Sequence, residues 1–240
     1  MSYDLTKLEN GLNEIKIKLS DNQINKLLKY YDLLIEQNKV MNLTTITEFE
    51  EVVEKHFLDS LSIFKVVDLN NPFSIIDIGT GAGFPGIPLK IAFPNLTILL
   101  ADSVNKKIKF LDHVIMELNL DNIDTIHARA EEMAKKKEFR EKFDICVSRA
   151  VANLSSLSEY CLPFVKYGGM FISYKSGEIE EELSQAKSAV FLLGGKLKVV
   201  EKFKLAGTEI SRSLVIINKD KKTPREYPRK AGIPLKNPIR

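Results

Sequence analysis

The sequence has few of the residues that mark secreted, metal-binding and membrane proteins. Its 240 residues contain two cysteines, Cys146 and Cys161, and no Cys-x-x-Cys pair. This excludes a disulfide-stabilised scaffold and a paired-cysteine zinc or redox motif. The three histidines have no metal-ligand spacing, so we expect no metal site. No run approaches the ~18 apolar residues of a membrane span, and the first residues do not resemble a signal peptide, so we expect a cytoplasmic protein without membrane contact.

The composition is that of a globular protein, with 44% hydrophobic and 28% charged residues. This balance excludes a largely disordered chain and a fibrous repeat. The net charge of +3 is unevenly distributed, because eight of the 35 basic and two of the 32 acidic residues lie in segment 219–240. That segment carries +6 and the rest of the chain −3. A basic tail on a slightly acidic body indicates either a polyanionic partner or a solvated terminus.

Two kinds of pattern divide the chain. Segment 1–70 is predicted to be helical, and Ser20-x-x-Gln23 and Thr47-x-x-Glu50 each have the spacing of a capping box. From residue 74 on, short apolar strands alternate with amphipathic helices, as in α/β proteins. We expect strands at 74–78, 96–101, 123–127, 143–148, 170–174, 197–203 and 213–218, and helices at 86–93, 105–118, 131–142, 154–165 and 178–193.

These elements predict an α/β fold with a seven-stranded, mostly parallel sheet covered by helices on both faces. The last two strands have no helix between them and predict an antiparallel hairpin at one edge. We therefore expect an N-terminal helical cap at 1–70, an α/β domain at 71–218 and a C-terminal arm at 219–240. Four of the nine prolines lie in the arm, which predicts an extended, irregular conformation. We expect a monomer.

The most informative stretch is a strand that runs into a glycine-rich turn followed by a helix. Gly81-x-Gly83-x-x-Gly86 matches a dinucleotide-binding pattern, but such a match alone is a weak signal. The strand runs directly into Gly79, which is too early for that motif. Asp77 also ends the strand where a pyrophosphate needs hydrogen-bond donors. A carboxylate there suits a positively charged nucleoside without phosphates, and S-adenosylmethionine has this chemistry.

Acidic and basic residues follow the next two strands. Asp102 ends the second strand, where a carboxylate accepts hydrogen bonds from ribose hydroxyls in several cofactor families. The third strand runs into Arg129, Ala130 and Glu131, which we expect near the adenine. Each acid alone is equally well explained as a helix cap. Together, at βαβ spacing, they favour an adenosine ligand.

At these residues the chain resembles the class I methyltransferases, whose sheet is Rossmann-like. Within them it is similar to the ribosomal RNA small subunit methyltransferase G family, also called glucose-inhibited division protein B. The resemblance covers roughly residues 35–240. Its motifs are Asn42-Leu-Thr44, His56-Phe-Leu-Asp59-Ser60, Asp77-Ile-Gly-Thr-Gly-Ala-Gly-Phe-Pro-Gly86, Asp102-Ser103, Arg129-Ala-Glu-Glu132, Ser148-Arg-Ala-Val-Ala152 and the tail from Thr223 to Pro238.

The resemblance implies methylation of N7 of one guanine in 16S rRNA, with S-adenosyl-L-methionine as cofactor. It implies that Asp102 holds the ribose and that Gly79, Phe84, Ala130, Glu131 and Arg149 contact the cofactor. From the glycine loop itself we add Asp77 and Gly81 to the cofactor-binding residues. Ser211 precedes Arg212 where relatives often have an acidic residue. The RNA-binding candidates are Arg129, Lys175, Arg212, Arg225, Arg229 and Lys230.

The residues after the fourth strand agree with methylation of a ring nitrogen of the base. They read Ser148-Arg149-Ala150-Val151, without the Asn/Asp-Pro-Pro-aromatic motif of enzymes that methylate exocyclic amines. Cys146 lies inside its strand, so it is not placed as a nucleophile. Guanine N7 has a free lone pair, so the reaction needs alignment and no general base. We expect Arg149 to orient the guanine, a phosphate or the cofactor.

Two other functions remain open at this stage. One is methylation of a small molecule, which the basic tail disfavours. The other is a non-catalytic module that binds RNA or the small ribosomal subunit and has kept the fold. If the arm contacts phosphates, removing residues 219–240 weakens RNA binding and flattens its salt dependence while cofactor affinity stays nearly unchanged.

Overall fold

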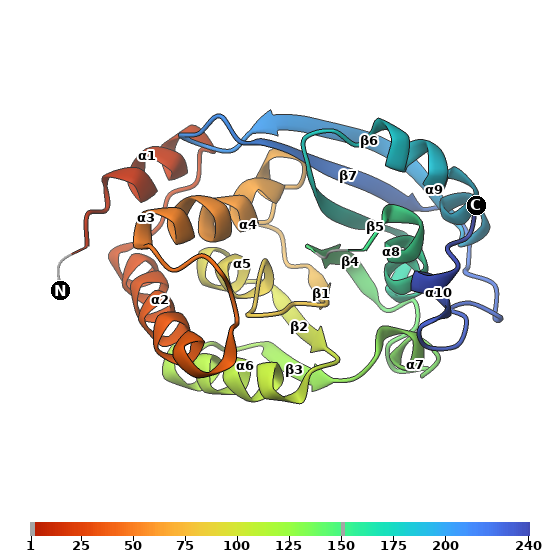
Figure 1. Cartoon of the computed structure of the whole chain (residues 1–240), viewed down its shortest axis with the longest axis horizontal. Helices are drawn as coiled ribbons and strands as arrows, with labels where there is room; N and C mark the ends of the chain where they lie inside the picture. The colour runs from red at the N-terminus through yellow and green to blue at the C-terminus, as the bar shows by residue number, and fades with distance from the viewer. Residues whose placement is uncertain (1–2, 150–151) are drawn as a thin grey trace.

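One sheet of seven strands runs through the computed structural model, which describes residues 3–149 and 152–240 (Figure 1). Ala150 and Val151 of the Ser-Arg-Ala motif lie outside the described residues. The strand order is β3-β2-β1-β4-β5-β7-β6. The strands are β1 (Ser74–Ile78), β2 (Thr97–Asp102), β3 (Ile123–His127), β4 (Phe143–Ser148), β5 (Val165–Ser176), β6 (Gly195–Lys204) and β7 (Ser211–Lys219).

The pairing confirms the predicted fold class. β1 to β5 are parallel, and β7 runs antiparallel to both β5 and β6. Because these parallel strands all end on the same side, Ile78, Asp102, His127 and Ser148 meet along one edge. Ligands of open α/β sheets bind at this edge.

Helices cover both faces of the sheet. Successive residues of a strand point to opposite faces, so Ile75 of β1 packs in one hydrophobic cluster and Ile76 in the other. The first cluster contains α1 (Thr6–Glu14), α2 (Asp21–Met41), α3 (Phe49–Val52), a π-helical turn (Val53–Leu58), α4 (Asp59–Leu61), a 3₁₀ turn (Ser62–Lys65), α5 (Gly86–Ala92) and α6 (Asn105–Glu117). The second contains α7 (Ala130–Met133), α8 (Leu154–Cys161), a 3₁₀ turn (Leu162–Phe164) and α9 (Glu180–Leu192).

One of the two predicted capping boxes forms. The Ser20 hydroxyl accepts from the Gln23 amide and the Gln23 side chain accepts from the Ser20 amide, so α2 begins as predicted. The prediction at Thr47 is wrong. α3 begins at Phe49 after Glu48, without a side-chain cap, while the Thr47 carbonyl accepts the Tyr31 hydroxyl at 2.9 Å.

The helix predicted over 131–142 is also wrong in extent. α7 ends at Met133, and turns follow it as far as Glu141, which has a left-handed φ of 54°. These turns place Arg140 against backbone carbonyls of the C-terminal arm, at 2.9 Å from Thr223 and from Tyr227. Tertiary hydrogen bonds to the arm therefore replace the later turns of this helix.

The C-terminal arm is irregular apart from α10 (Ile233–Lys236), as predicted, but it packs on the body and does not extend away from it (Figure 1). Lys219, where the arm begins, is 1% exposed, and its ammonium group donates to the Leu162 carbonyl at 2.8 Å. Further along, the Ser156 hydroxyl donates to the Pro234 carbonyl at 2.7 Å. Among the described residues, no helix is long and apolar enough to cross a membrane.

Candidate active site

The glycine loop after β1 is organised from below by a buried carboxylate. Asp77 Oδ2 accepts the Thr80 hydroxyl at 2.7 Å and the Gly86 amide at 3.0 Å. Gly86 has no room for a side chain, because a Cβ there would lie 2.2 Å from Leu100. Asp77 Oδ1 has no hydrogen-bond partner among the described residues, and burial raises the pKa of this carboxyl to about 7.

A second carboxylate, at the end of β2, fixes the same loop from the side. Asp102 Oδ2 accepts the Gly81 amide at 3.0 Å, and Oδ1 accepts the Val104 amide at 2.9 Å. Gly81 has a φ of +64°, which glycine adopts without steric cost. Lys107 is 3.7 Å from Asp102 Oδ2. With two carboxylates at this loop, a cationic ligand is favoured over a phosphate.

A cavity of about 260 Å³, here called the strand-end cavity, opens beside Asp102. Ile78, Ala101 and Ser148 line it from the sheet, and the residues after β3 line it from the next side. Leu157 and Tyr160 of α8 also line it. The remaining lining residues are Gly79, Asp102, Ser103, Ala128, Arg129, Ala130, Glu131, Ala152, Gly232 and Leu235.

The structure brings together only some of the residues predicted for the cofactor. Gly79, Asp102, Ala130 and Glu131 all line the strand-end cavity, and so does Arg129, which was predicted for RNA. Asp77, Gly81 and Phe84 do not line it. Asp77 is fully buried beneath the glycine loop, and the Phe84 ring packs under the neighbouring basic side chains. The structure shows Asp77 and Phe84 supporting the site from below, and contact of these three residues with the cofactor stays a prediction.

A wider cavity of about 670 Å³, here called the cationic cavity, adjoins the first one at Ala152. Its basic side chains come from the π-helical turn, the end of β4 and the facing ends of β5 and β7. Its lining residues are Ile46, Lys55, His56, Asp59, Arg149, Ala152, Asn153, Tyr174, Lys175, Ser176, Glu182 and Arg212. Arg149, Lys175 and Arg212, all predicted from the sequence, are thus brought together here.

Asp59 joins two of these arginines. Its Oδ2 accepts from Arg149 at 3.0 Å and its Oδ1 accepts from the Nε of Arg212 at 3.0 Å. Asp59 is 4% exposed, so both guanidinium groups neutralise a carboxylate removed from water. Lys175 is held in a similar way, donating to Glu182 and to the Ala152 carbonyl at 2.8 Å. The basic side chains therefore have fixed positions.

His56 is neutral and fully engaged. The Thr44 hydroxyl accepts the Ile46 amide at 3.1 Å and lies 2.9 Å from His56 Nε2. Nδ1 lies 3.0 Å from the Lys55 carbonyl, which favours a proton on this nitrogen, and 3.2 Å from Arg149 Nη2, a donor that favours the other tautomer. Burial, and then the charge of Arg149, lower the pKa of His56 to about 3. The ring is therefore a poor base near neutral pH.

The Phe84 ring packs against His56 and Arg149. Its ring is stacked with His56 at a centroid distance of 4.5 Å, and the Arg149 guanidinium lies 4.9 Å from its centroid. Tyr30 of α2 packs against the same ring at 5.4 Å. A cation over an aromatic face is attracted by the ring quadrupole. The glycine loop thus orients Arg149 as well as shaping the strand-end cavity.

The sequence reasoning missed most of the support for Arg149. Lys55, Asp59 and Glu182 were not predicted as site residues, and His56 entered only as part of a family motif. Three of them lie in or next to the π-helical turn Val53–Leu58, a conformation that is frequent at functional sites. The motifs around Thr44 and His56 were the available signal, but nothing in their spacing shows that they contact Arg149.

The basic residues of the arm differ among themselves. Arg225 and Lys230 are exposed. Arg229 instead forms an ion pair with Glu159, with its Nη2 2.7 Å from Oε2, and Glu159 is fully buried. Arg229 is thereby engaged in holding the arm to α8, which argues against its predicted contact with RNA.

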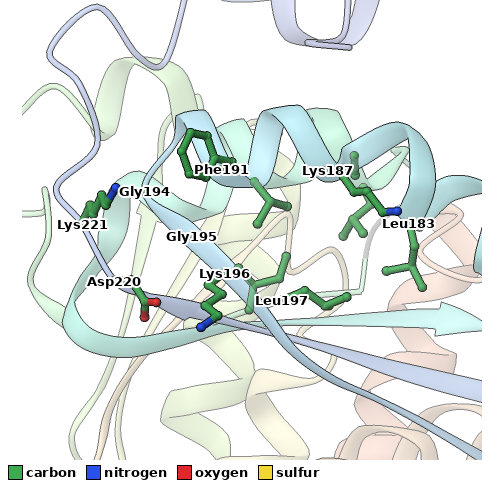
Figure 2. A pocket seen from close by; sticks show the side chains of 13 residues that line it. Leu183, Lys187, Phe191, Gly194, Gly195, Lys196, Leu197, Asp220 and Lys221 are labelled. Carbon is green, nitrogen blue, oxygen red and sulfur yellow. The ribbon is translucent and has the colours of Figure 1, made fainter.

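A third cavity, of about 440 Å³, lies between α9 and the start of β6 (Figure 2). Its lining is mainly apolar, with Phe191 of α9 beside Lys221 and with Lys187 and Lys196 around it. The residues predicted for cofactor and RNA, all within the described ranges, are not among its lining residues. It takes no part in the candidate active site.

Comparison with known proteins agrees with this geometry. The family model described as rRNA small subunit methyltransferase G matches residues 23–215. The Ribosomal RNA small subunit methyltransferase G of Lachnoclostridium phytofermentans is 56% identical over 229 residues, which cover 95% of each chain. Its namesake in Desulforamulus reducens is 51% identical and covers 98% of this chain and 99% of its own.

Solved structures share the fold at low identity. TYW2 of M. jannaschii, solved in complex with AdoMet, superposes with a TM-score of 0.55 at 16% identity, over 73% of this chain and 79% of that one. This confirms the predicted class of sheet. The matched family model and the near full-length relatives establish that this chain belongs to the rRNA small subunit methyltransferase G family.

Proposed function

We propose that this chain transfers a methyl group from S-adenosylmethionine to N7 of a guanine in 16S rRNA. Family membership supports a methyltransferase that acts on ribosomal RNA of the small subunit. The observation that carries the proposal is the junction of two unlike cavities at Ala152. One has the acidic strand end that suits a cationic nucleoside, and the other has the fixed basic groups that suit a nucleic acid.

The strand-end cavity fits the cofactor. Asp102 is placed to accept from ribose hydroxyls, since each carboxylate oxygen already accepts one amide and retains a further lone pair. Gly79, Ala130 and Glu131 bound the same space, and Leu157 and Tyr160 offer apolar surface to a base. In its ionised form, buried Asp77 adds negative potential beneath the loop, which suits a cofactor with ammonium and sulfonium groups. When bound, S-adenosylmethionine supplies an electrophilic methyl group.

The cationic cavity is the proposed guanine and phosphate site. Arg149 has a planar fork of donors for a base edge or a phosphate, and Phe84, Lys55 and Asp59 fix its orientation. Lys175 and Arg212 line the same space and are proposed to contact the RNA backbone. Positioning of two reactants supplies about 7–11 kcal/mol of a barrier.

The protonation states in this cavity agree with attack by a ring nitrogen. Asp59 and Glu182 are each paired with cations, and the depressed pKa of His56 makes it a weak base. Among the described lining residues, no free carboxylate or imidazole is poised to remove a proton. Guanine N7 carries no proton to remove, so alignment alone is sufficient.

The proposed substrate is 16S rRNA, either free or within the small subunit, in the cytoplasm, with the chain acting as a monomer. Arg225 and Lys230 of the arm are exposed and are proposed to add contacts with phosphates outside the cavity. Arg129 lies at the strand-end cavity, so we place it nearer to the cofactor than to the RNA.

The test is transfer of a labelled methyl group to 16S rRNA and to small subunits taken from a strain that lacks this gene. The labelled nucleoside is then identified after digestion. We expect 7-methylguanosine, and the more active of the two substrates shows when the enzyme acts during assembly. Label in another nucleoside contradicts the proposed atom. Cofactor binding without any label contradicts 16S rRNA as the substrate.

A further inference from the structure

The C-terminal arm forms part of the wall of the strand-end cavity. Gly232 and Leu235 line it beside residues of the sheet edge and of α8. The Gly232 amide donates to Glu131 Oε1 at 2.9 Å, so the arm is attached to a residue of the same wall. We propose that the arm is a strap that retains the cofactor, with Leu235 as a cofactor-contacting residue; this rests on the proposed function.

Several contacts from the body hold the strap in place. Arg229 donates to the fully buried Glu159 through Nε at 3.0 Å and through Nη2 at 2.7 Å. Hydrogen bonds between ionised groups are roughly twice as strong as neutral ones. Glu159 belongs to α8, and so do Leu157 and Tyr160, which line the cavity. One helix thus supplies part of the cavity wall and the anchor of the strap.

Leu235 is the residue of the strap that we expect to contribute to cofactor affinity. It is 58% exposed although it lines a cavity, so a flat apolar group bound there removes leucine surface from water. Ile233, in the same turn of helix and 39% exposed, does not line the cavity. The two residues form a matched pair, since both are partly exposed aliphatic side chains of α10 and only one faces the ligand space.

The strap also connects cofactor retention with RNA. Arg225 and Lys230 are exposed on either side of Arg229 and precede the cavity-lining residues. Phosphates bound to these side chains restrain the arm in its packed position, so cofactor leaves more slowly while RNA is bound. The earlier expectation that removal of 219–240 leaves cofactor affinity nearly unchanged disagrees with this arrangement.

Titration calorimetry with S-adenosylmethionine and S-adenosylhomocysteine tests the strap. The proteins are the full chain, Leu235→Ala, Ile233→Ala and a chain ending at Gly232, each checked for folding by thermal melting. We expect Leu235→Ala to raise the Kd about fivefold, the shortened chain to raise it further, and Ile233→Ala to stay within twofold of the full chain. Equal losses for Leu235→Ala and Ile233→Ala overturn the assignment to Leu235, and no loss in any variant overturns the strap.

Limited trypsin digestion gives a readout that does not depend on affinity. Saturating S-adenosylhomocysteine is expected to slow cleavage after Lys230 and Lys236 in the full chain, and to slow it less in Leu235→Ala. Unchanged cleavage in the presence of saturating ligand overturns the strap. If the full chain binds neither cofactor form, the proposed function itself fails, and this result is distinct from loss of binding confined to variants of the arm.

Discussion

The two adjoining cavities differ in what builds them. The strand-end cavity is formed largely by the ends of neighbouring parallel strands and the loops that follow, so sheet topology places most of its residues. The cationic cavity depends on side chains from 55–59, β5, α9 and β7 and on Arg149 after β4, which come together only through tertiary packing. The first contains the carboxylates Asp102 and Glu131, and the second is dominated by cations. The comparison predicts that substitutions in the strand-end cavity act mainly on cofactor affinity and substitutions in the cationic cavity mainly on RNA recognition.

The largest expected effect is the loss of methyl transfer on substitution of Arg149, which lines the cationic cavity only. Arg149→Ala is expected to lower methyl transfer by about 10²–10³-fold, because a fixed donor facing the reacting base is lost. Asp59 keeps Arg212 as its partner, so the fold is expected to persist. Calorimetry is expected to give a cofactor Kd within twofold of the unsubstituted chain. The control Arg149→Lys keeps the charge without the planar fork, so its rate of methyl transfer should lie between those of the unsubstituted chain and Arg149→Ala. A Kd that rises in step with the loss of transfer would assign Arg149 to the cofactor.

Substitution of Asp102 tests the other cavity, since it should weaken cofactor binding and leave RNA binding unchanged. Asp102→Ala removes the acceptor of the Gly81 and Val104 amides and the proposed ribose contact. We expect cofactor affinity to fall about 30–100-fold, as for the loss of charge-assisted hydrogen bonds worth about 2–3 kcal/mol. RNA binding without cofactor, measured by filter retention, should not change. Asp102→Asn retains the shape and should lose less. Equal weakening of RNA binding would mean that the cavities are not independent.

Asp77 lies beneath the loop that both cavities share, and its expected effect is on stability. Its pKa of about 7 in the folded protein is above the ordinary value of 3.8, so the folded state binds the extra proton. Stability conferred by this group is therefore greatest at low pH and falls as pH rises from about 4 to about 7. Asp77→Asn removes this dependence. Relative to the unsubstituted chain, the variant should gain about 2 kcal/mol in unfolding free energy between pH 5.5 and pH 8.

Urea denaturation of both proteins at the two pH values measures this difference. Other titrating groups are common to both chains and cancel. A difference that does not change with pH would mean that the Asp77 carboxyl is ionised throughout this range, and it would contradict the raised pKa of this group.

The contrast between the cavities also explains how far the sequence could predict the site. β1, β3 and β4 have the predicted bounds, and β2 lies one residue later than predicted. For β1 and β4 the reason is that buried parallel strands are largely apolar runs, whereas β3 is a partly exposed edge strand. Residues attached to those ends, such as Asp102 and Glu131, therefore lie where topology puts them. The partners of Arg149 could not be located, since Asp59 is 90 residues away and its carboxylate could equally have capped a helix.

The C-terminal arm shows the same limit of prediction from sequence, here for its basic residues. Its charge and prolines predicted an irregular basic segment, and both features hold. Nothing in its composition distinguishes exposed Lys230 from Arg229, which is held by a buried carboxylate, or from buried Lys219. A basic residue becomes structural when a distant segment supplies its counter-ion. Whether a basic residue is structural therefore depends on where the fold places its acidic partner, which the sequence does not show.

The smallest expected effect concerns the part of the arm that contributes charge without lining either cavity. Arg225→Gln combined with Lys230→Gln removes two exposed cations and leaves Arg229, Gly232 and Leu235 in place. Each phosphate contact contributes about 0.7–0.9 to the slope of log affinity against log salt, so the slope for 16S rRNA should decrease by roughly 1.5. Affinity near physiological salt should fall only several-fold, and cofactor Kd without RNA should stay constant. Lys18→Gln with Lys198→Gln, two exposed lysines outside the arm, is the charge-matched control. If both pairs change the slope equally, the arm acts only through net charge; if only the arm pair does, the segment that bounds the cofactor cavity also contacts the RNA.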